Sequence, residues 1–301
     1  ELPCKDKVGL TMVWTRLTTL FVMTVGLIFA KAYLQFQGKT IKLFQFTDLV
    51  TYGATSERDL FWRKAKVMAV LCLGQLFSLG WSMGLTWASL NIVQSHAYML
   101  TGLHSPTVLL LYLLSCQRVH KFEKIGTLIV ILGVAITMSD PLAVRIGEEF
   151  DMQKSLISLL ANIPAAIFWI IVGYVSKRLD SVTMLFSQIS LSLFYFTIGS
   201  VVFEGSGLNL SDEGLLGAFS SKNFLFCMFW SGIWAGFFGF CGYMISARHY
   251  SPLVIMNLLL VEPLVSQIFG VALKIDKMPG PLTFMGVGVI IWATNIIHNG
   301  Q

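Results

Sequence analysis

Apolar stretches of about 20 residues recur along the whole chain and constrain its fold more than any other feature. Of the 301 residues, 55% are hydrophobic and 12% are charged, whereas ordinary soluble domains carry about 25% charged residues. About 20 apolar residues in a helix are enough to span the core of a bilayer. The pattern therefore predicts an all-α, multi-pass integral membrane protein.

Nine stretches of the sequence are expected to cross the membrane. The uncharged run 67–117 is too long for one crossing, and the polar residues Asn91, Gln94 and Ser95 interrupt it, so it predicts a helical hairpin. The other expected spans lie near residues 12–34, 122–138, 154–176, 181–203, 223–247, 251–273 and 281–297, and a polar connection, 35–66, follows the first. The acidic segment 139–153 links a first half, residues 1–138, with four spans to a second half, residues 154–301, with five.

Basic residues concentrate in alternate connections between the expected spans, and acidic residues concentrate in the others. Lys177, Arg178 and Arg248 lie in basic connections, whereas the segments 139–153 and 204–222 are acidic. The positive-inside rule places the basic connections and the C-terminus in the cytosol and both acidic segments outside, without indicating which membrane. The net charge of +5 is thus a topology signal, and no basic run interleaved with aromatic residues predicts a nucleic-acid partner.

The 204–222 segment contains a sequon for N-glycosylation, Asn209-Leu210-Ser211. Asn209 is therefore a candidate modification site in a eukaryotic host, with a chance sequon as the alternative. Five widely spaced cysteines without a CxxC pair predict neither a disulfide framework nor a metal site. The sequence also lacks HExxH, GxSxG and paired carboxylates, so neither an enzyme nor a bound cofactor is expected.

One carboxylate, Glu262, and one proline, Pro263, lie in the middle of an otherwise apolar stretch near the C-terminus. An ionisable group at mid-depth in a membrane costs at least about 3 kcal/mol, so Glu262 is expected to face a bundle interior, a partner or a watery cavity. Glu262 is a candidate for loading a proton or binding a cationic amine, with Arg16 of the first span as its candidate partner. A structural carboxylate bonded to a neighbouring helix is the alternative.

Two windows of the sequence resemble each other, and each contains a proline within an apolar helix. Pro106 in HSPT at 104–107 aligns with Pro263 in LVEPLVSQ at 260–267, so that Ser105 corresponds to Glu262. Charge places the turn after the first window in the cytosol and the turn after the second outside. This predicts an inverted repeat with hinges at Pro106 and Pro263.

On these residues, together with GPLTFMGVGVI at 280–290 and Thr15-Arg16, the sequence resembles the drug/metabolite transporter superfamily, EamA type, over nearly its whole length. The resemblance implies ten helices in two inverted five-helix halves with both termini in the cytosol, so one helix before the first is expected to be missing here. Sugar-phosphate and nucleotide-sugar members meet phosphate with lysines or arginines. The matching stretch IMNLLLVEP has none, which disfavours a phosphorylated anion.

Polar and aromatic residues at helical spacing mark the candidate substrate site, because steps of three, four and seven share one helix face. The candidate substrate-binding residues are Ser82, Thr86, Tyr98, Thr101, Ser105, Asn162, Trp169, Tyr243, Glu262 and Ser266. Small hydroxyl side chains also pack and hydrogen-bond between membrane helices, which is the alternative for each Ser and Thr. His96 and His104 are interpreted as hydrogen-bonded structural residues, with a gating or pH role as the alternative.

These features favour a secondary transporter that moves a small polar, zwitterionic or cationic metabolite by alternating access, with proton coupling through Glu262 and Arg16 as an option. The alternative is a non-transporting membrane subunit or scaffold with a transporter-like fold. The expected partners are a small-molecule substrate and membrane lipid. A homodimer or a complex with another membrane protein is left open.

Overall fold

The computed structural model describes residues 7–38, 45–92, 94–116, 118–140, 152–250, 255, 259, 262–274, 278 and 280–299. Within these ranges, the side chains of some residues are not described. They are Gln94, Ser95, Met99, Met152, Ser155, Pro263, Leu264, Ser266, Gln267, His298 and Asn299. This part of the chain is helical, apart from connections and one isolated bridge between Phe46 and Leu179.

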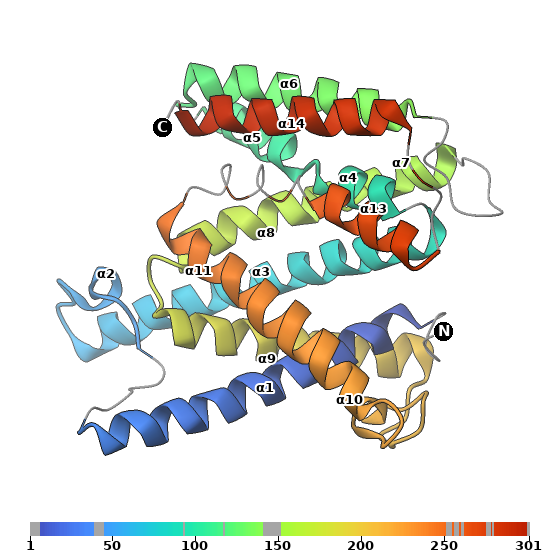
Figure 1. Cartoon of the computed structure of the whole chain (residues 1–301). Helices are drawn as coiled ribbons and strands as arrows, with labels where there is room; N and C mark the ends of the chain where they lie inside the picture. Colours follow the sequence, from blue (N-terminus) through green and yellow to red (C-terminus); the bar gives the residue numbers. More distant parts are fainter. Residues whose placement is uncertain are drawn as a thin grey trace. The chain divides into compact units, whose positions relative to one another are not determined.

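The helices of the described part follow one another along the chain (Figure 1). They are α1 (Val8–Phe36), α2 (Asp48–Thr51), α3 (Glu57–Asn91), α4 (Gln94–Gly102), α5 (His104–Leu114), α6 (Lys121–Met138), α7 (Met152–Leu160), α8 (Asn162–Val175), α9 (Ser181–Glu204), η1 (Gly217–Phe219), α10 (Phe224–Phe226), η2 (Cys227–Phe240), α11 (Cys241–His249), α13 (Glu262–Ala272) and α14 (Pro281–Asn299).

Six helical segments among the described residues are long and apolar enough to cross a bilayer. They are Val8–Phe36, Glu57–Asn91, His96–Leu114, Leu156–Val175, Ser181–Glu204 and Phe224–His249. These segments fit a multi-pass, all-α integral membrane protein. The further spans expected at 122–138, 251–273 and 281–297 stay predictions, and much of the stretch 251–261 lies outside the described residues.

The helix α3 begins ten residues earlier than the sequence pattern predicts, at Glu57 instead of residue 67. The Ser56 hydroxyl accepts a hydrogen bond of 3.1 Å from the backbone N–H of Asp59, which is the bond of a helix N-cap. Arg63 pairs with Asp59 one turn earlier at 2.9 Å. Charged residues therefore form the first two turns of this helix, where a prediction based on apolar residues alone expects a loop.

The chain divides into two compact units that do not follow the predicted halves. Unit 1 comprises residues 1–79 and 171–249, and unit 2 comprises residues 80–170 and 250–301. Each unit therefore takes residues from both sequence halves. The inverted repeat of 1–138 and 154–301 stays a prediction.

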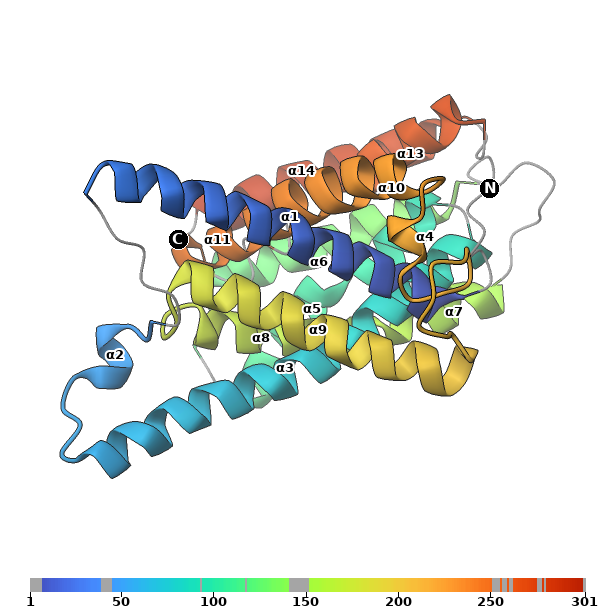
Figure 2. The same cartoon turned by 90° about the horizontal axis from the view of Figure 1, so that it is seen from below.

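Unit 1 is built around α1, which packs against α9 and η2 (Figure 2). Its core consists of Leu10, Val13, Trp14, Phe196, Leu215, Ala218 and Cys227. The segment η2 is a π-helix of 14 residues. Its Gly232 and Gly236 face the Thr18 carbonyl and the Thr19 side chain, and a Cβ on either glycine would crowd α1. Small residues thus let two helices approach closely, as in other membrane interfaces.

Unit 2 contains the pair α6 and α14, which lie side by side (Figure 1). Their shared core consists of Val130, Val134, Val287, Ile290 and Ala293. Asp140, directly after α6, caps α14 by accepting hydrogen bonds from the Thr283 N–H at 3.0 Å and hydroxyl at 2.6 Å. In the same unit, α4 packs against α7 and α13.

Candidate functional site

Two apolar segments of unit 2 are each broken into two helices. The first break separates α4 from α5 at Leu103, and the second separates α7 from α8 at Ala161. A proline explains each break, since it lacks an N–H and its ring clashes with the carbonyl four residues earlier. Pro106 acts on Gly102, the last residue of α4, and Pro164 acts on Leu160, the last residue of α7.

A polar residue opens the helix after each break, and its side chain bonds to a carbonyl of a preceding helix end. Asn162 Nδ2 donates to the carbonyl oxygen of Leu159 at 2.9 Å and also to that of Leu100. The Nδ1 atom of His104 lies 3.2 Å from the Thr101 carbonyl oxygen, so we assign the ring proton to Nδ1. Because Leu100 is in the last turn of α4, Asn162 joins one break to the other.

The helix α3 makes room for the second break with two glycines one turn apart. A Cβ on Gly80 would lie 3.3 Å from the Cβ of Pro164, and a Cβ on Gly84 would lie 2.5 Å from the Cβ of Ala161. A side chain at Gly84 would therefore displace the broken segment, and one at Gly80 would be tightly packed against it. The Gly80-x-x-x-Gly84 motif brings the backbones of α3 and the α7–α8 break together.

Four aromatic rings lie beside the two breaks. Trp81 of α3 has its ring centroid 5.8 Å from His104, 5.9 Å from Phe168 and 6.0 Å from Trp169. The rings of His104 and Trp169 are nearly parallel, with an interplanar angle of 17° and centroids 6.5 Å apart. Together with Asn162, these four residues form what we call the helix-break site.

Three buried polar atoms of the helix-break site have no hydrogen-bond partner among the described residues. They are His104 Nε2, Asn162 Oδ1 and Trp169 Nε1. His104 and Trp169 are 1% exposed and Asn162 is 4% exposed. Buried polar atoms in native proteins are nearly always hydrogen-bonded. Three unsatisfied atoms in this one site therefore point to a ligand or ordered water.

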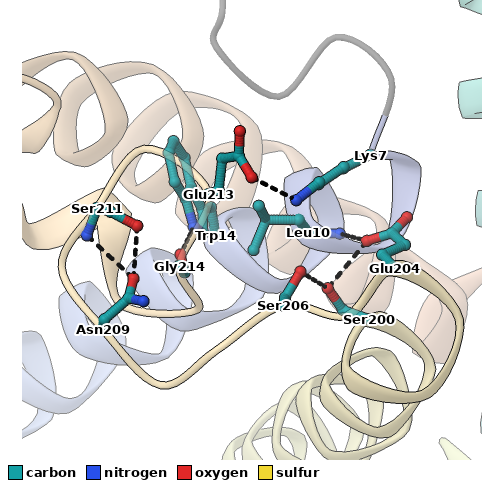
Figure 3. A network of polar contacts seen from close by, with 10 residues as sticks. All are labelled: Lys7, Leu10, Trp14, Ser200, Glu204, Ser206, Asn209, Ser211, Glu213 and Gly214. Atoms are coloured by element: carbon teal, nitrogen blue, oxygen red, sulfur yellow. Dashed lines mark hydrogen bonds and ion pairs between the residues drawn. The ribbon is translucent and has the colours of Figure 1, made fainter.

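A polar cluster in unit 1 shows the opposite situation, because its groups bond to each other (Figure 3). The Glu204 carboxylate accepts hydrogen bonds from the backbone N–H groups of Gly9 at 2.6 Å and Leu10 at 2.8 Å, and from the Ser200 hydroxyl at 2.9 Å. Glu204 thus satisfies free N–H groups at the start of α1 and is favourably placed against its dipole. We interpret this cluster as structural.

The loop after α9 is held against α1 by the same cluster (Figure 3). Trp14 donates from Nε1 to the Gly214 carbonyl at 2.9 Å, and Lys7 pairs with Glu213 at 2.9 Å. Asn209 is exposed, and its Oδ1 accepts a hydrogen bond of 2.6 Å from the Ser211 hydroxyl. The predicted sequon therefore lies on an exposed part of an ordered loop, while its modification stays a prediction.

Several predicted site residues use their hydroxyl groups within their own helix. The hydroxyl of Thr86 bonds to the Ser82 carbonyl at 2.8 Å, and that of Thr101 to the Ala97 carbonyl at 2.6 Å. This favours the packing alternative for both threonines. The break at Leu103 also falls between predicted site residues. Tyr98 and Thr101 lie on α4, Ser105 lies on α5, and Tyr98 and Ser105 both make further interactions.

The remaining predicted residues lie outside the helix-break site. Glu262 is half-buried and begins α13, which packs against α4. The side chains of Pro263 and Ser266 lie outside the described ones. Tyr243 is on α11 of unit 1. Substrate binding by these residues and hinge motion at Pro263 stay predictions.

Arg16 lies on α1 of unit 1. Its guanidinium carbon is 4.9 Å from the centre of the Phe240 ring, the geometry of a cation–π contact. Its Nε is buried and has no hydrogen-bond partner in the described part of the chain. Pairing of Arg16 with Glu262 stays a prediction.

Sequence reasoning named Asn162 and Trp169 as site residues and His104 as a hydrogen-bonded structural residue, and it did not name Trp81. A usable signal is present, since His104-x-Pro106 and Asn162-x-Pro164 share one spacing. In each, a polar residue two positions before a proline interrupts an apolar run. That pattern predicts a helix end with a side-chain cap at mid-span.

No protein-family model matches the chain, and comparison with curated proteins also gives no match. The resemblance to the drug/metabolite transporter superfamily therefore stays a prediction from sequence. The structure supports the class of protein. In its described part the chain is all-α and has six helical segments suited to crossing a membrane.

Proposed function

We propose that this protein is a secondary transporter that moves a small polar, zwitterionic or cationic metabolite across a membrane by alternating access. In this proposal the helix-break site binds the substrate. The observation that carries it is the pair of adjoining proline breaks with three buried, unpartnered polar atoms. Interrupted helices at membrane depth are characteristic of transporter substrate sites, because freed backbone and side-chain groups become available to a ligand.

The alternative explanation for the breaks is structural, and energetics argue against it. Interrupting a helix with an interior proline costs about 3 kcal/mol. Each buried polar atom without a partner adds about 1–3 kcal/mol. Two breaks and three unpartnered atoms in one unit would lower the free energy of unfolding considerably if they served packing alone. A substrate site that is filled and emptied in each transport cycle explains why they are present.

The proposal is tested by efflux from liposomes. Purified protein is reconstituted into liposomes loaded with adenine, cytosine, myo-inositol, glycine and choline, which represent neutral, zwitterionic and cationic metabolites. We expect at least one probe to leave faster than from protein-free liposomes. Efflux of all five at the protein-free rate contradicts the proposal and favours a non-transporting membrane subunit.

A matched pair of variants connects the efflux to the site. His104→Phe keeps an aromatic ring of similar size but removes both ring nitrogens, and we expect efflux to fall by about tenfold, the effect of one lost hydrogen bond. The control is His249→Phe, because His249 is exposed on α11. Equal efflux by both variants would place the substrate elsewhere.

A further inference from the structure

The unpartnered atoms of the helix-break site form a defined set of hydrogen-bond donors and acceptors. Asn162 uses its Nδ2 group for two carbonyl oxygens, so its Oδ1 remains as an acceptor. His104 directs Nδ1–H at the Thr101 carbonyl, so Nε2 of the neutral ring is a second acceptor. Trp169 Nε1 can only donate. A ligand that pairs with all three atoms donates two hydrogen bonds and accepts one.

The side chains around these atoms are flat and uncharged. Trp81, Phe168, Trp169 and the neutral His104 ring pack against one another, with centroid separations from 5.6 to 6.5 Å. Aromatic faces attract other flat rings through offset or edge-to-face contacts. None of the five residues of the site carries a charge to pair with a charged ligand. Burying an unpaired charge here would be costly.

We propose that the helix-break site binds an uncharged, planar heteroaromatic ring that donates two hydrogen bonds and accepts one at its edge. Nucleobases are readily available molecules of this chemistry. The inference rests on the proposed function and narrows its substrate class. Polyols lack the flat face, plain aromatic hydrocarbons lack the polar edge, and ions lack a partner of opposite charge in the site.

Binding to the purified full-length protein in detergent tests the ring class directly. Adenine is the probe, myo-inositol is the polar control that is not flat, and benzene is the flat control without polar groups. We expect adenine to raise the unfolding temperature saturably, because a ligand that binds only the folded state stabilises it. The two controls should leave it unchanged. Absence of a shift with adenine overturns the inference and leaves ordered water as the occupant.

Two tryptophan variants locate the binding. Trp169→Phe keeps a buried ring and removes only the N–H donor, so it should weaken adenine binding by about tenfold, the effect of one lost hydrogen bond. Trp230→Phe is the matched control, since Trp230 is 51% exposed on η2. Equal adenine affinity in the two variants overturns the inference.

The efflux experiment separates failure of the ring class from failure of transport. If myo-inositol or glycine leaves the liposomes in a His104-dependent way and adenine neither binds nor leaves, the ring class is wrong and transport stands. If adenine binds in a Trp169-dependent way and no probe leaves, the ring class stands and transport is wrong.

Discussion

At the scale of single residues, Asn162 has the most consequential position in the described structure. Its side chain bonds to carbonyl oxygens at the ends of two helices, α4 and α7. The last four carbonyls of a helix have no partner within the helix. One amide therefore satisfies groups from both breaks and still leaves an acceptor free.

Replacing Asn162 should destabilise the protein more than replacing a comparable asparagine. Asn162→Leu keeps the volume but removes the hydrogen bonds to the buried Leu100 carbonyl and the part-buried Leu159 carbonyl, and we expect the free energy of unfolding to fall by about 1–3 kcal/mol. Asn91→Leu is the control, because Asn91 donates to the Trp87 carbonyl of its own helix and bridges no second helix among the described residues, and it should cost under about 1 kcal/mol. Unfolding in detergent measures both, and equal losses would contradict the bridging role.

The loop between α9 and α10 should contribute to stability in a pH-dependent way. Hydrogen bonds from Lys222 at 2.8 Å and Asn223 at 2.9 Å lower the pKa of Asp212 below its ordinary value of 3.8. Because the folded pKa is the lower one, the contribution is present above the unfolded pKa of about 3.9 and is lost as the pH falls through the folded pKa.

We therefore expect the unfolding temperature of the wild-type protein to fall more steeply with acid than that of Asp212→Asn. The comparison runs from about pH 6 to about pH 3, which brackets the titration of aspartate. Lys222→Met removes the same ion pair from the other side and should flatten the curve similarly. Parallel curves for all three proteins would show that Asp212 contributes nothing.

The residues of the site were predictable only in part, for a physical reason. Helical spacing selected Asn162 and Trp169, and both are buried, while substrate binding by them stays a prediction. The spacing rule assumes an unbroken helix, so it does not hold across Leu103, where α4 has ended and α5 has not begun. The Thr101 hydroxyl bonds within its own helix, which favours the packing alternative that helical spacing alone could not separate from substrate binding.

At the scale of elements, prolines and glycines determine the site together. Prolines end α4 and α7, and the glycines of α3 allow the second break to approach. Long apolar runs predicted most helices, including the boundary between α3 and α4 at residues 91–94. The start of α3 at Glu57 and the π-helix η2 were missed, since caps, charged turns and local hydrogen-bond shifts leave no apolar signal.

Adding one methyl group should have opposite effects at two helical glycines. Gly84→Ala places a Cβ against Ala161, and overpacking of this kind costs about 1–3 kcal/mol. Gly288→Ala on α14 meets nothing within 4 Å and should stabilise by up to about 1 kcal/mol through helix propensity. Unfolding free energies in detergent compare the two. Equal effects would mean that α3 does not contact the break closely.

At the scale of the whole molecule, the two compact units combine residues from both sequence halves. Composition predicted an all-α membrane protein, and the six long apolar segments agree with that. The grouping into units was not predictable from the chain order, because it depends on contacts between segments that are far apart in sequence.

The charge pattern predicts on which side of the membrane each connection lies. In eukaryotic cells the exposed Asn209 should carry a glycan that peptide-N-glycosidase removes, and Asn209→Gln should abolish the mobility shift. Lys177→Cys, in the connection between α8 and α9, should react with an impermeant maleimide only after permeabilisation. Absence of the glycan together with labelling in intact cells would reverse the topology.

The central claim is that two proline-broken helices form the substrate site of a transporter, and restoring the helices tests it most directly. Pro106→Ala and Pro164→Ala each return an N–H to the interrupted helix, whereas Pro281→Ala changes the first residue of α14, where no helical bond is at stake. Efflux of the five-probe mixture is measured from liposomes containing each folded variant. We predict about a tenfold or greater loss for Pro106→Ala and Pro164→Ala and wild-type efflux for Pro281→Ala. Wild-type efflux by all three variants would contradict the account.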